Sequence, residues 1–176
     1  MNITINLTGC RLHITNTDKF KSTLVSMKFK NDLTRETATI RSLLSMVLLG
    51  GTKQLPSIKS LAIHLEDLYG ANLTSNVSTK GQAQIIHLSS TFVNENYLVS
   101  SEALFEQQLN LMKDILFDPN FENGIFSQNI VEAKKRELKE RLTALKDDKY
   151  TYALDQTLDA MGKNQVLGIS GIGYEE

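Results

Sequence analysis

The sequence predicts an α+β fold in which an antiparallel sheet packs against helices. A pair of strand-like stretches precedes two helical ones, a second strand pair follows, and the rest of the chain is mainly helical. This order lacks the regular strand–helix–strand repeat of a parallel sheet. The chain has 176 residues, of which 41% are hydrophobic, so it is long enough to bury a core in one domain.

The first strand pair is expected within residues 9–30, as the stretches CRLHI and STLVSMKFK. The second stretch alternates apolar with polar side chains, which is typical of a strand with one buried face. Its two faces hold Val25, Met27 and Phe29 on one side and Ser26, Lys28 and Lys30 on the other. Residues 15–18 form the predicted connection between the two strands.

Two helices are expected next. The first begins at Arg35, where the period of the pattern changes, and ends at Gly50-Gly51, because glycine readily adopts the left-handed conformation that ends a helix. Its periodic residues are Thr39, Leu43, Met46, Val47 and Leu49. The second opens at Pro56-Ser57 and ends at Gly70, with apolar side chains at the spacing of one helix face. These are Ile58, Leu61, Ala62, Leu65, Leu68 and Tyr69.

The second strand pair is predicted from NLTSNVS and QAQIIHLSSTF, joined by Thr79-Lys80-Gly81, which supplies the glycine of a tight hairpin. Three helices are expected after it, over residues 101–117, 125–146 and 150–161. The first of these ends at Asp118-Pro119, because proline disfavours a helical residue before it. The second carries an expected inner stripe of Ile130, Leu138, Leu142 and Leu145.

Charge and composition exclude several classes of partner. The 19 Lys and Arg residues nearly cancel the 20 Asp and Glu residues, so no overall field attracts nucleic acid or an anionic membrane. The stretch MNITINLTGCRLHI is neither a signal peptide nor a membrane span. The single cysteine, Cys10, has no partner for an internal disulfide. We therefore expect a cytoplasmic protein that binds neither nucleic acid nor membrane.

The end of the sequence, GISGIGYEE, follows a glycine-rich segment and shows no capping element. We expect residues 1–176 to be one N-terminal domain truncated from a longer chain.

The frame around the first helix resembles that of the pitrilysin and insulinase zinc metallopeptidases, the inverzincins, which carry His-x-x-Glu-His on this helix. The resemblance rests on VLLGGT at 47–52, Pro56, LEDLYGANL at 65–73, the Lys80-Gly81 hairpin and the two long helices after it. Within the group, the chain resembles an inactive bacterial branch, the YfmF type, whose members accompany a partner that keeps the zinc motif. The resemblance implies a pitrilysin/LuxS-like metalloenzyme fold and covers the N-terminal part of a full-length member.

The resemblance places Ser42 and Met46 at the two His positions of the motif and Ser45 at the Glu position. In the motif, two imidazoles one helical turn apart hold Zn²⁺ while the carboxylate activates a bound water. A hydroxyl and a thioether are poor zinc ligands, and neither serine is a base at neutral pH. The sequence therefore predicts that this helix neither binds zinc nor activates a water molecule.

The remaining zinc ligand of the family is a glutamate on a later helix. The most natural register places Arg141 there, with Glu137 and Glu140 as near misses. Because a fixed cation opposes Zn²⁺, the resemblance implies that this chain has no catalytic residue, no metal ligand and no cofactor.

Four other features could carry chemistry, and each has a plainer structural interpretation. His64 beside Asp67, together with His87, could form a displaced metal pair, but a solvated helix histidine and an ordinary strand histidine are favoured. GISGIG lacks the strand, helix and lysine that surround a phosphate loop. The charges of EAKKRELKERLTALKDDK alternate in sign, which is typical of a solvated helix face rather than a nucleic-acid patch. Ser42 and Ser45 have no neighbouring base that would activate a nucleophile.

The resemblance implies a catalytically inactive subunit that pairs with a zinc-bearing pitrilysin-like homologue and helps to hold a peptide substrate, for instance along an exposed sheet edge. Two alternatives stay open. One is a non-proteolytic peptide-binding or scaffold protein, and the other is an active zinc-dependent peptidase that uses other ligands.

Overall fold

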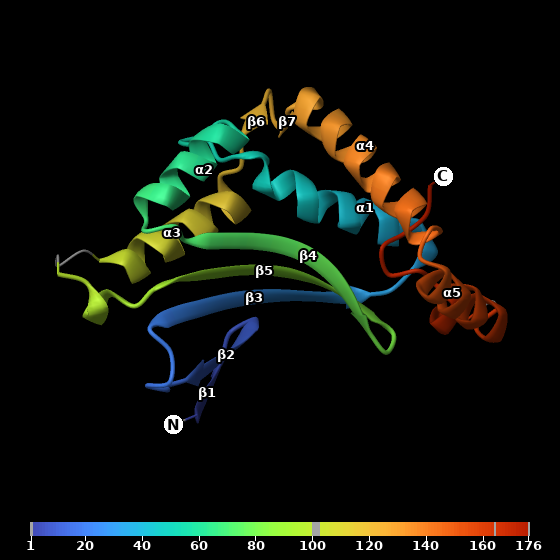
Figure 1. The fold of residues 1–176 in the computed structure, drawn as a ribbon, viewed down its shortest axis with the longest axis horizontal. Helices are drawn as coiled ribbons and strands as arrows, with labels where there is room; N and C mark the ends of the chain where they lie inside the picture. Colours follow the sequence, from blue (N-terminus) through green and yellow to red (C-terminus); the bar gives the residue numbers. More distant parts are fainter. Residues whose placement is uncertain (1, 100–102, 164, 176) are drawn as a thin grey trace.

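The computed structural model describes residues 2–99, 103–163 and 165–175. Its centre is a three-stranded antiparallel sheet of order β3-β5-β4, formed by β3 (Ser22–Asp32), β4 (Asn72–Lys80) and β5 (Ala83–Val93). Helices cover one face of this sheet (Figure 1). The predicted antiparallel sheet packed against helices is confirmed, whereas the pitrilysin/LuxS-like fold implied by the resemblance stays a prediction.

The register of the sheet follows from alternation along the central strand. Ile86, Leu88 and Phe92 are buried on the helix side of β5, because residues two apart on a strand share a face. On the opposite face Lys28 of β3 and Asn76 of β4 flank His87. The predicted alternation of β3 therefore holds, with its lysines away from the core.

The core lies between the sheet and three helices: α1 (Arg35–Val47, continued by the short 3₁₀ helix η1, Leu48–Gly50), α2 (Ile58–Asp67) and α3 (Leu104–Phe117). Its largest cluster joins buried residues from the helices and from β5, namely Leu48, Leu61, Leu88, Leu111, Met112 and Ile115. Both helices predicted before the second strand pair are confirmed. Residues 101 and 102 of the next predicted helix lie outside the described residues.

The glycine stop after α1 has a steric cause. Gly51 has φ +136°, and a Cβ atom there would lie 2.5 Å from the carbonyl oxygen of Leu55. At Gly50 a Cβ atom would lie 2.6 Å from Cγ2 of Ile130, on the facing helix α4 (Gln128–Leu145). The stop therefore allows both a turn that only glycine adopts readily and the close approach of α4.

The second helix starts as the sequence predicts. The Ser57 hydroxyl accepts from the Ser60 backbone N–H, and the Ser60 hydroxyl accepts from the Ser57 backbone N–H, which satisfies two N–H groups that the helix leaves unpaired. At the other end, Tyr69 and Gly70 both have positive φ. Gly70 thus fulfils its predicted role, and Tyr69 adopts a conformation that side chains other than glycine rarely take.

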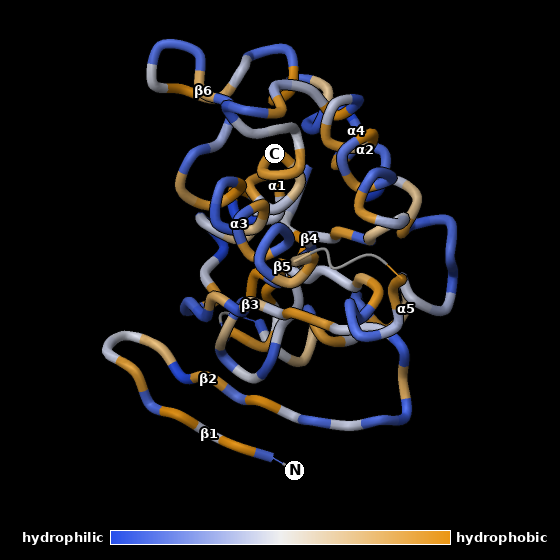
Figure 2. The backbone as a smooth tube through the Cα atoms, turned by 90° about the vertical axis from the view of Figure 1, so that its left-hand side faces the viewer, coloured by the Kyte–Doolittle hydropathy of each residue, from blue (hydrophilic) through white to orange (hydrophobic). Residues whose placement is uncertain are grey.

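The N-terminal hairpin was only half predicted. β2 (Cys10–Thr15) matches the expected first strand, but it pairs with β1 (Asn2–Leu7), which the sequence analysis did not propose. The alternation of β1 is clear in NITINL, and Gly9, with φ +83°, makes the turn. The hairpin lies below the sheet and apart from the helices (Figures 1 and 2).

The long charged helix begins later than predicted, at Gln128 rather than near residue 125. Residues 125 and 126 instead form β7 (Ile125–Phe126), which pairs with β6 (Phe121–Glu122). Asn123 and Gly124 have the positive φ values of a tight turn between them. Leu145, expected on the inner stripe, is 38% exposed, whereas Leu138 and Leu142 are buried as predicted.

The last predicted helix is confirmed as α5 (Lys149–Met161), capped by Asp148, and the short 3₁₀ helix η3 (Val166–Gly168) follows it. The chain then returns to α1, where Thr39 Oγ1 accepts from the Tyr174 N–H at 2.9 Å and the Arg35 guanidinium stacks on the Tyr174 ring. No helix in the described part of the chain is long and apolar enough to span a membrane.

Candidate functional site

The three motif positions, Ser42, Ser45 and Met46, lie on α1 and are here called the motif triad. All three are buried: both serines are 2% exposed and Met46 is 7% exposed. Their side chains therefore belong to the contacts of α1 with its neighbours, and a substrate cannot reach them without a change in the packing.

Met46, which the resemblance places at the second His position, is packed among hydrocarbon side chains. It forms a cluster with Leu138 and Leu142 of α4, and Leu43 and Ile172 pack against that cluster. A buried methionine surrounded by aliphatic side chains is a core residue, because its flexible thioether fills irregular space. The position that the resemblance assigns to a zinc ligand thus holds α1 against α4.

The two serine hydroxyls are not arranged for catalysis. Ser45 Oγ donates to the Ser42 carbonyl oxygen at 2.8 Å, a local bond that serines commonly make within a helix. Ser42 Oγ is buried and has no hydrogen-bond partner among the described residues. No histidine or lysine base reaches either hydroxyl in this part of the structure, so the geometry does not support a serine nucleophile.

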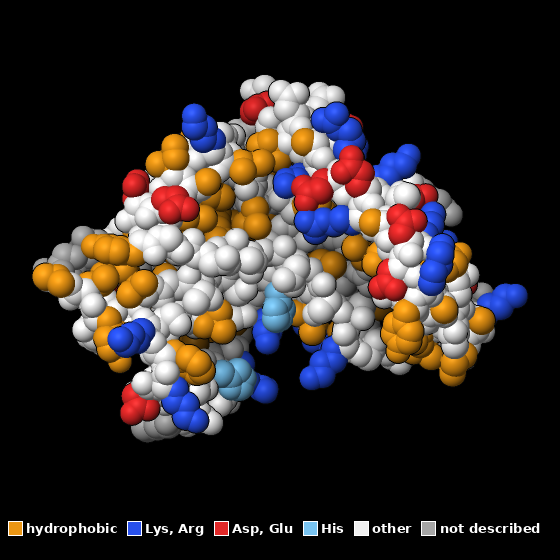
Figure 3. Space-filling view, in the orientation of Figure 1, with side chains coloured by type: hydrophobic (Ala, Val, Ile, Leu, Met, Phe, Trp, Pro, Cys, Tyr) orange, Lys and Arg blue, Asp and Glu red, His pale blue; other side chains and the backbone are white. Residues whose placement is uncertain are grey.

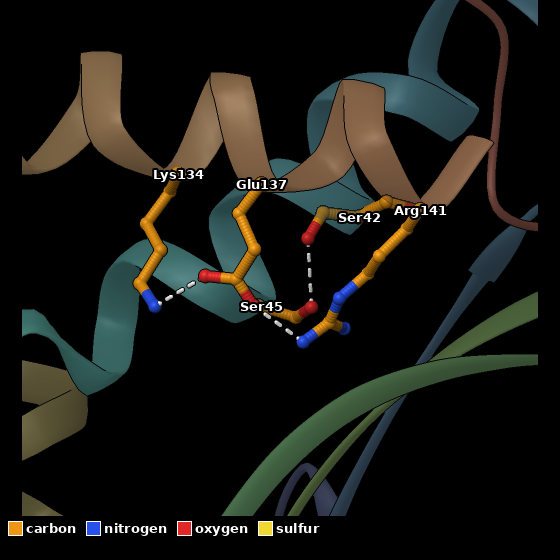
Figure 4. Close-up of polar contacts among 5 residues, drawn as sticks. All are labelled: Ser42, Ser45, Lys134, Glu137 and Arg141. Atoms are coloured by element: carbon orange, nitrogen blue, oxygen red, sulfur yellow. Dashed lines mark hydrogen bonds and ion pairs between the residues drawn. The ribbon is translucent and has the colours of Figure 1, made fainter. Parts of the chain in front are cut away.

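Above the motif triad, α4 presents Lys134, Glu137 and Arg141, here called the charged row. Glu137 Oε2 accepts from Lys134 Nζ at 2.7 Å, and Glu137 Oε1 accepts from Arg141 Nη2 at 2.5 Å. Figure 4 shows the Arg141 side chain extending from α4 toward Ser45 on α1. The hydrogen bond from Lys134, and then the charges of Lys134 and Arg141, hold the pKa of Glu137 below its usual value.

The register that places Arg141 at the zinc-ligand position stays a prediction. The structure brings Arg141 and Glu137 to the side of α4 that faces α1 (Figure 4), whereas Glu140 follows the half-buried Glu137 by three residues and is exposed. Lys134 was not singled out from the sequence. The spacing of residues 134, 137 and 141, which share a helix face, was the signal that could have found it.

The outer edge of β4 lies beside this site. Within the described sheet β4 has one neighbour, β5, and α1 contacts both β4 and α4. Figure 3 shows charged side chains over α4 and a recessed hydrophobic area between α2 and α4, above β4. An extended segment could therefore lie along β4 beneath the charged row.

A cavity of about 550 Å³ lies elsewhere, between α4, α5 and the last described residues. Tyr152, Asp155 and Tyr174 are among its lining residues, and neither the serines of the motif triad nor the charged row lines it. The cavity and the motif positions are therefore separate features.

The histidines do not assemble a metal site. Among the described residues, no group of three or more His, Cys, Asp or Glu side chains could hold a metal ion. His87 lies on the sheet face away from the helices, where partial burial and then the neighbouring charge of Lys28 lower its pKa. His13 hydrogen-bonds Thr4 across the N-terminal hairpin.

The GISGIG segment and the charged segment of α4 also have structural roles. The GISGIG segment packs against the fold: Gln84 Nε2 donates to the Gly171 carbonyl oxygen, and a Cβ atom at Gly173 would lie 2.3 Å from Thr39 Oγ1. The mixed charges of α4 pair along the helix, as between Lys135 and Glu132. Close packing and intrahelical ion pairs explain both segments without a phosphate or a nucleic acid.

Comparison with known proteins supports a link to metallopeptidases. No family model matches the chain. Over 156 residues, 89% of its length, the chain is 35% identical to a protein of Bacillus subtilis (strain 168) named "Probable inactive metalloprotease YmfF". The chain is similar to a probable inactive metalloprotease. The name of this relative is YmfF, not YfmF as in the branch that the resemblance implies, and the chain spans 37% of its length.

A solved structure has the same fold. The crystal structure of a conserved protein from Enterococcus faecalis V583 matches 99% of this chain with a TM-score of 0.90 and 28% sequence identity. The match covers 41% of that protein. The chain therefore spans about two fifths of the length of both proteins it matches here.

Proposed function

We propose that this chain is part of a catalytically inactive homologue of the pitrilysin-like metallopeptidases, which acts as the partner subunit of an active zinc peptidase in peptide processing. One observation carries the proposal: the motif triad is buried in the packing of α1 and faces a helix that presents Arg141. The name of the B. subtilis relative agrees with the loss of activity.

The proposed contribution of this subunit is to hold the peptide. An exposed edge strand pairs with an extended segment through main-chain hydrogen bonds, which tolerate many side-chain sequences. β4 offers nine residues for this purpose. The helix α1 survives without its metal because its buried face supports the core.

The test is coexpression of the full-length protein with a zinc-bearing pitrilysin-like homologue from the same organism. We expect the two to purify as a stable pair, and we expect the homologue to cleave peptides faster in the pair than alone. A solitary full-length protein that binds peptides would contradict the subunit role and favour the non-proteolytic binding protein.

A further inference from the structure

The charged row combines two cations with one carboxylate. Both oxygens of Glu137 are occupied, one by Lys134 and the other by Arg141. Since an ionised carboxylate balances one of the two positive charges, the row carries a net positive charge at neutral pH. The hydrogen bond from Lys134 is the main cause that holds the pKa of Glu137 below its usual value, so Glu137 is ionised at neutral pH.

The Arg141 guanidinium has more N–H donors than the one that bonds Glu137. A guanidinium carries five N–H groups, and with the residues that the structure describes Arg141 makes one hydrogen bond, to Glu137. Its side chain is 56% exposed. A second carboxylate can therefore reach it from solvent and complete a network of two cations and two anions.

The other charges near the site do not oppose this binding. Arg41 lies on α1 one turn before Ser45, and it donates to the Asp32 carbonyl oxygen and, at 3.5 Å, to Gln84 Oε1. Glu140 is adjacent to Arg141 in sequence and therefore points to another side of α4. Of the charged side chains named here on α1 and on the charged row, three are cations, Arg41, Lys134 and Arg141, and one is an anion, Glu137.

We propose that the site selects extended peptides with an acidic side chain, which Arg141 and Lys134 bind while the peptide backbone pairs with β4. The inference rests on the proposed function, because it requires a peptide along β4. It adds the class of substrate and names Arg141 as a specificity-determining residue.

The binding test uses the full-length protein and two nine-residue peptides matched to the length of β4. Both are acetylated and amidated, and they differ only in a central Glu or Gln. We expect the Glu peptide to bind about fivefold more tightly, a difference set by one partly exposed ion pair. Hydrogen exchange of the β4 amides should slow in the complex.

The variants identify which cation is responsible. R141M should reduce the Glu preference to about twofold or less. K134M should reduce the preference less, because Lys134 is the more buried of the two cations. R136M is the matched control: it removes one positive charge from the exposed side of α4 and should keep the full preference.

Equal binding of the Glu and Gln peptides would overturn the inference and leave the peptide-holding role intact. Protection of a segment other than β4, or loss of the preference in R136M, would overturn it too. Failure to bind either peptide would overturn it as well. The pairing itself is measured separately by copurification, so the failure of the proposed subunit role is distinguishable.

Discussion

At the scale of the residue, the three positions that the resemblance assigns to the zinc motif are occupied by side chains that pack within the protein. Ser42 and Ser45 are small enough to be buried where α1 packs, and Met46 is apolar enough to enter the core. The resemblance assigns two imidazoles and a carboxylate to these positions in a zinc peptidase. Met46 instead packs against Leu138 and Leu142.

The packing role of Met46 can be measured directly. Met46→Ala should destabilise the protein by about 2–5 kcal/mol, because it removes buried hydrocarbon from the cluster with Leu138 and Leu142. Urea denaturation followed by circular dichroism gives the free energy of unfolding. Ile40→Ala is the control, since Ile40 lies on the same helix and is 65% exposed, and its effect should stay within about 0.5 kcal/mol. Equal effects would contradict the packing role.

The ionisation of Glu137 gives a second prediction. Its folded pKa lies below the ordinary value of 4.5, so its ion pairs stabilise the fold above that pH and the contribution is lost as the pH falls through the folded pKa. Lys134→Met should raise the pKa of Glu137 more than Arg141→Met, because the hydrogen bond from Lys134 is the largest cause. Carboxyl NMR titration measures both, and an unchanged pKa in Lys134→Met would refute the assignment.

At the scale of the element, sequence patterns predicted most helices and strands because their signals are local. The capping serine of α2, Gly70 and the Lys80-Gly81 hairpin each act within a few residues of their position. β1 was not predicted although NITINL alternates, and all of its residues are exposed, so the pattern marks no buried face. The start of α4 was predicted too early, because residues 125 and 126 pair with β6 as β7 instead of opening the helix.

The candidate site was predicted only in part for a different reason. The motif triad followed from the frame of one helix, so its positions could be named. The ion pairs of the charged row follow from the spacing of residues 134, 137 and 141 within α4, but no local pattern shows which side of α4 faces α1. Arg141 and Glu137 were named through the resemblance, whereas the place of Lys134 beside Glu137 comes from the structure.

The turn after α1 provides a prediction for an element. Gly51→Ala should destabilise the protein by on the order of 1–3 kcal/mol, because φ is +136° and a Cβ atom would meet the Leu55 carbonyl oxygen. Gly81→Ala is the matched control: its φ is also positive, but nothing lies within 4 Å of the added atom. Its effect should be about 1 kcal/mol. Thermal denaturation compares the two, and a larger loss in Gly81→Ala would contradict the steric cause.

At the scale of the whole molecule, the described chain consists of a sheet with helices on one face and a hairpin that stands apart from them (Figure 1). All residues of β1 and β2 are exposed, including the aliphatic side chains Ile3, Ile5, Leu7, Leu12 and Ile14. A two-stranded hairpin without further support is marginally stable in water. Stability is therefore expected to differ between the hairpin and the core.

Hydrogen exchange tests this difference across the molecule. The amides of β1 and β2 should exchange orders of magnitude faster than those of β5, which lies at the centre of the sheet and opens only with the core. Mass spectrometry after timed exchange resolves the two regions. Equal protection would show that another surface covers the hairpin.

The loss of the zinc site is tested most directly by the zinc content of the full-length protein after incubation with zinc and dialysis. A peptide-cleavage assay on the same sample tests the loss of activity. A zinc-bearing homologue treated in parallel is the control and should retain about one zinc per chain. We predict zinc far below that level and no cleavage by this protein alone. Zinc near one per chain, with cleavage that a chelator abolishes, would contradict it and establish an active peptidase with other ligands.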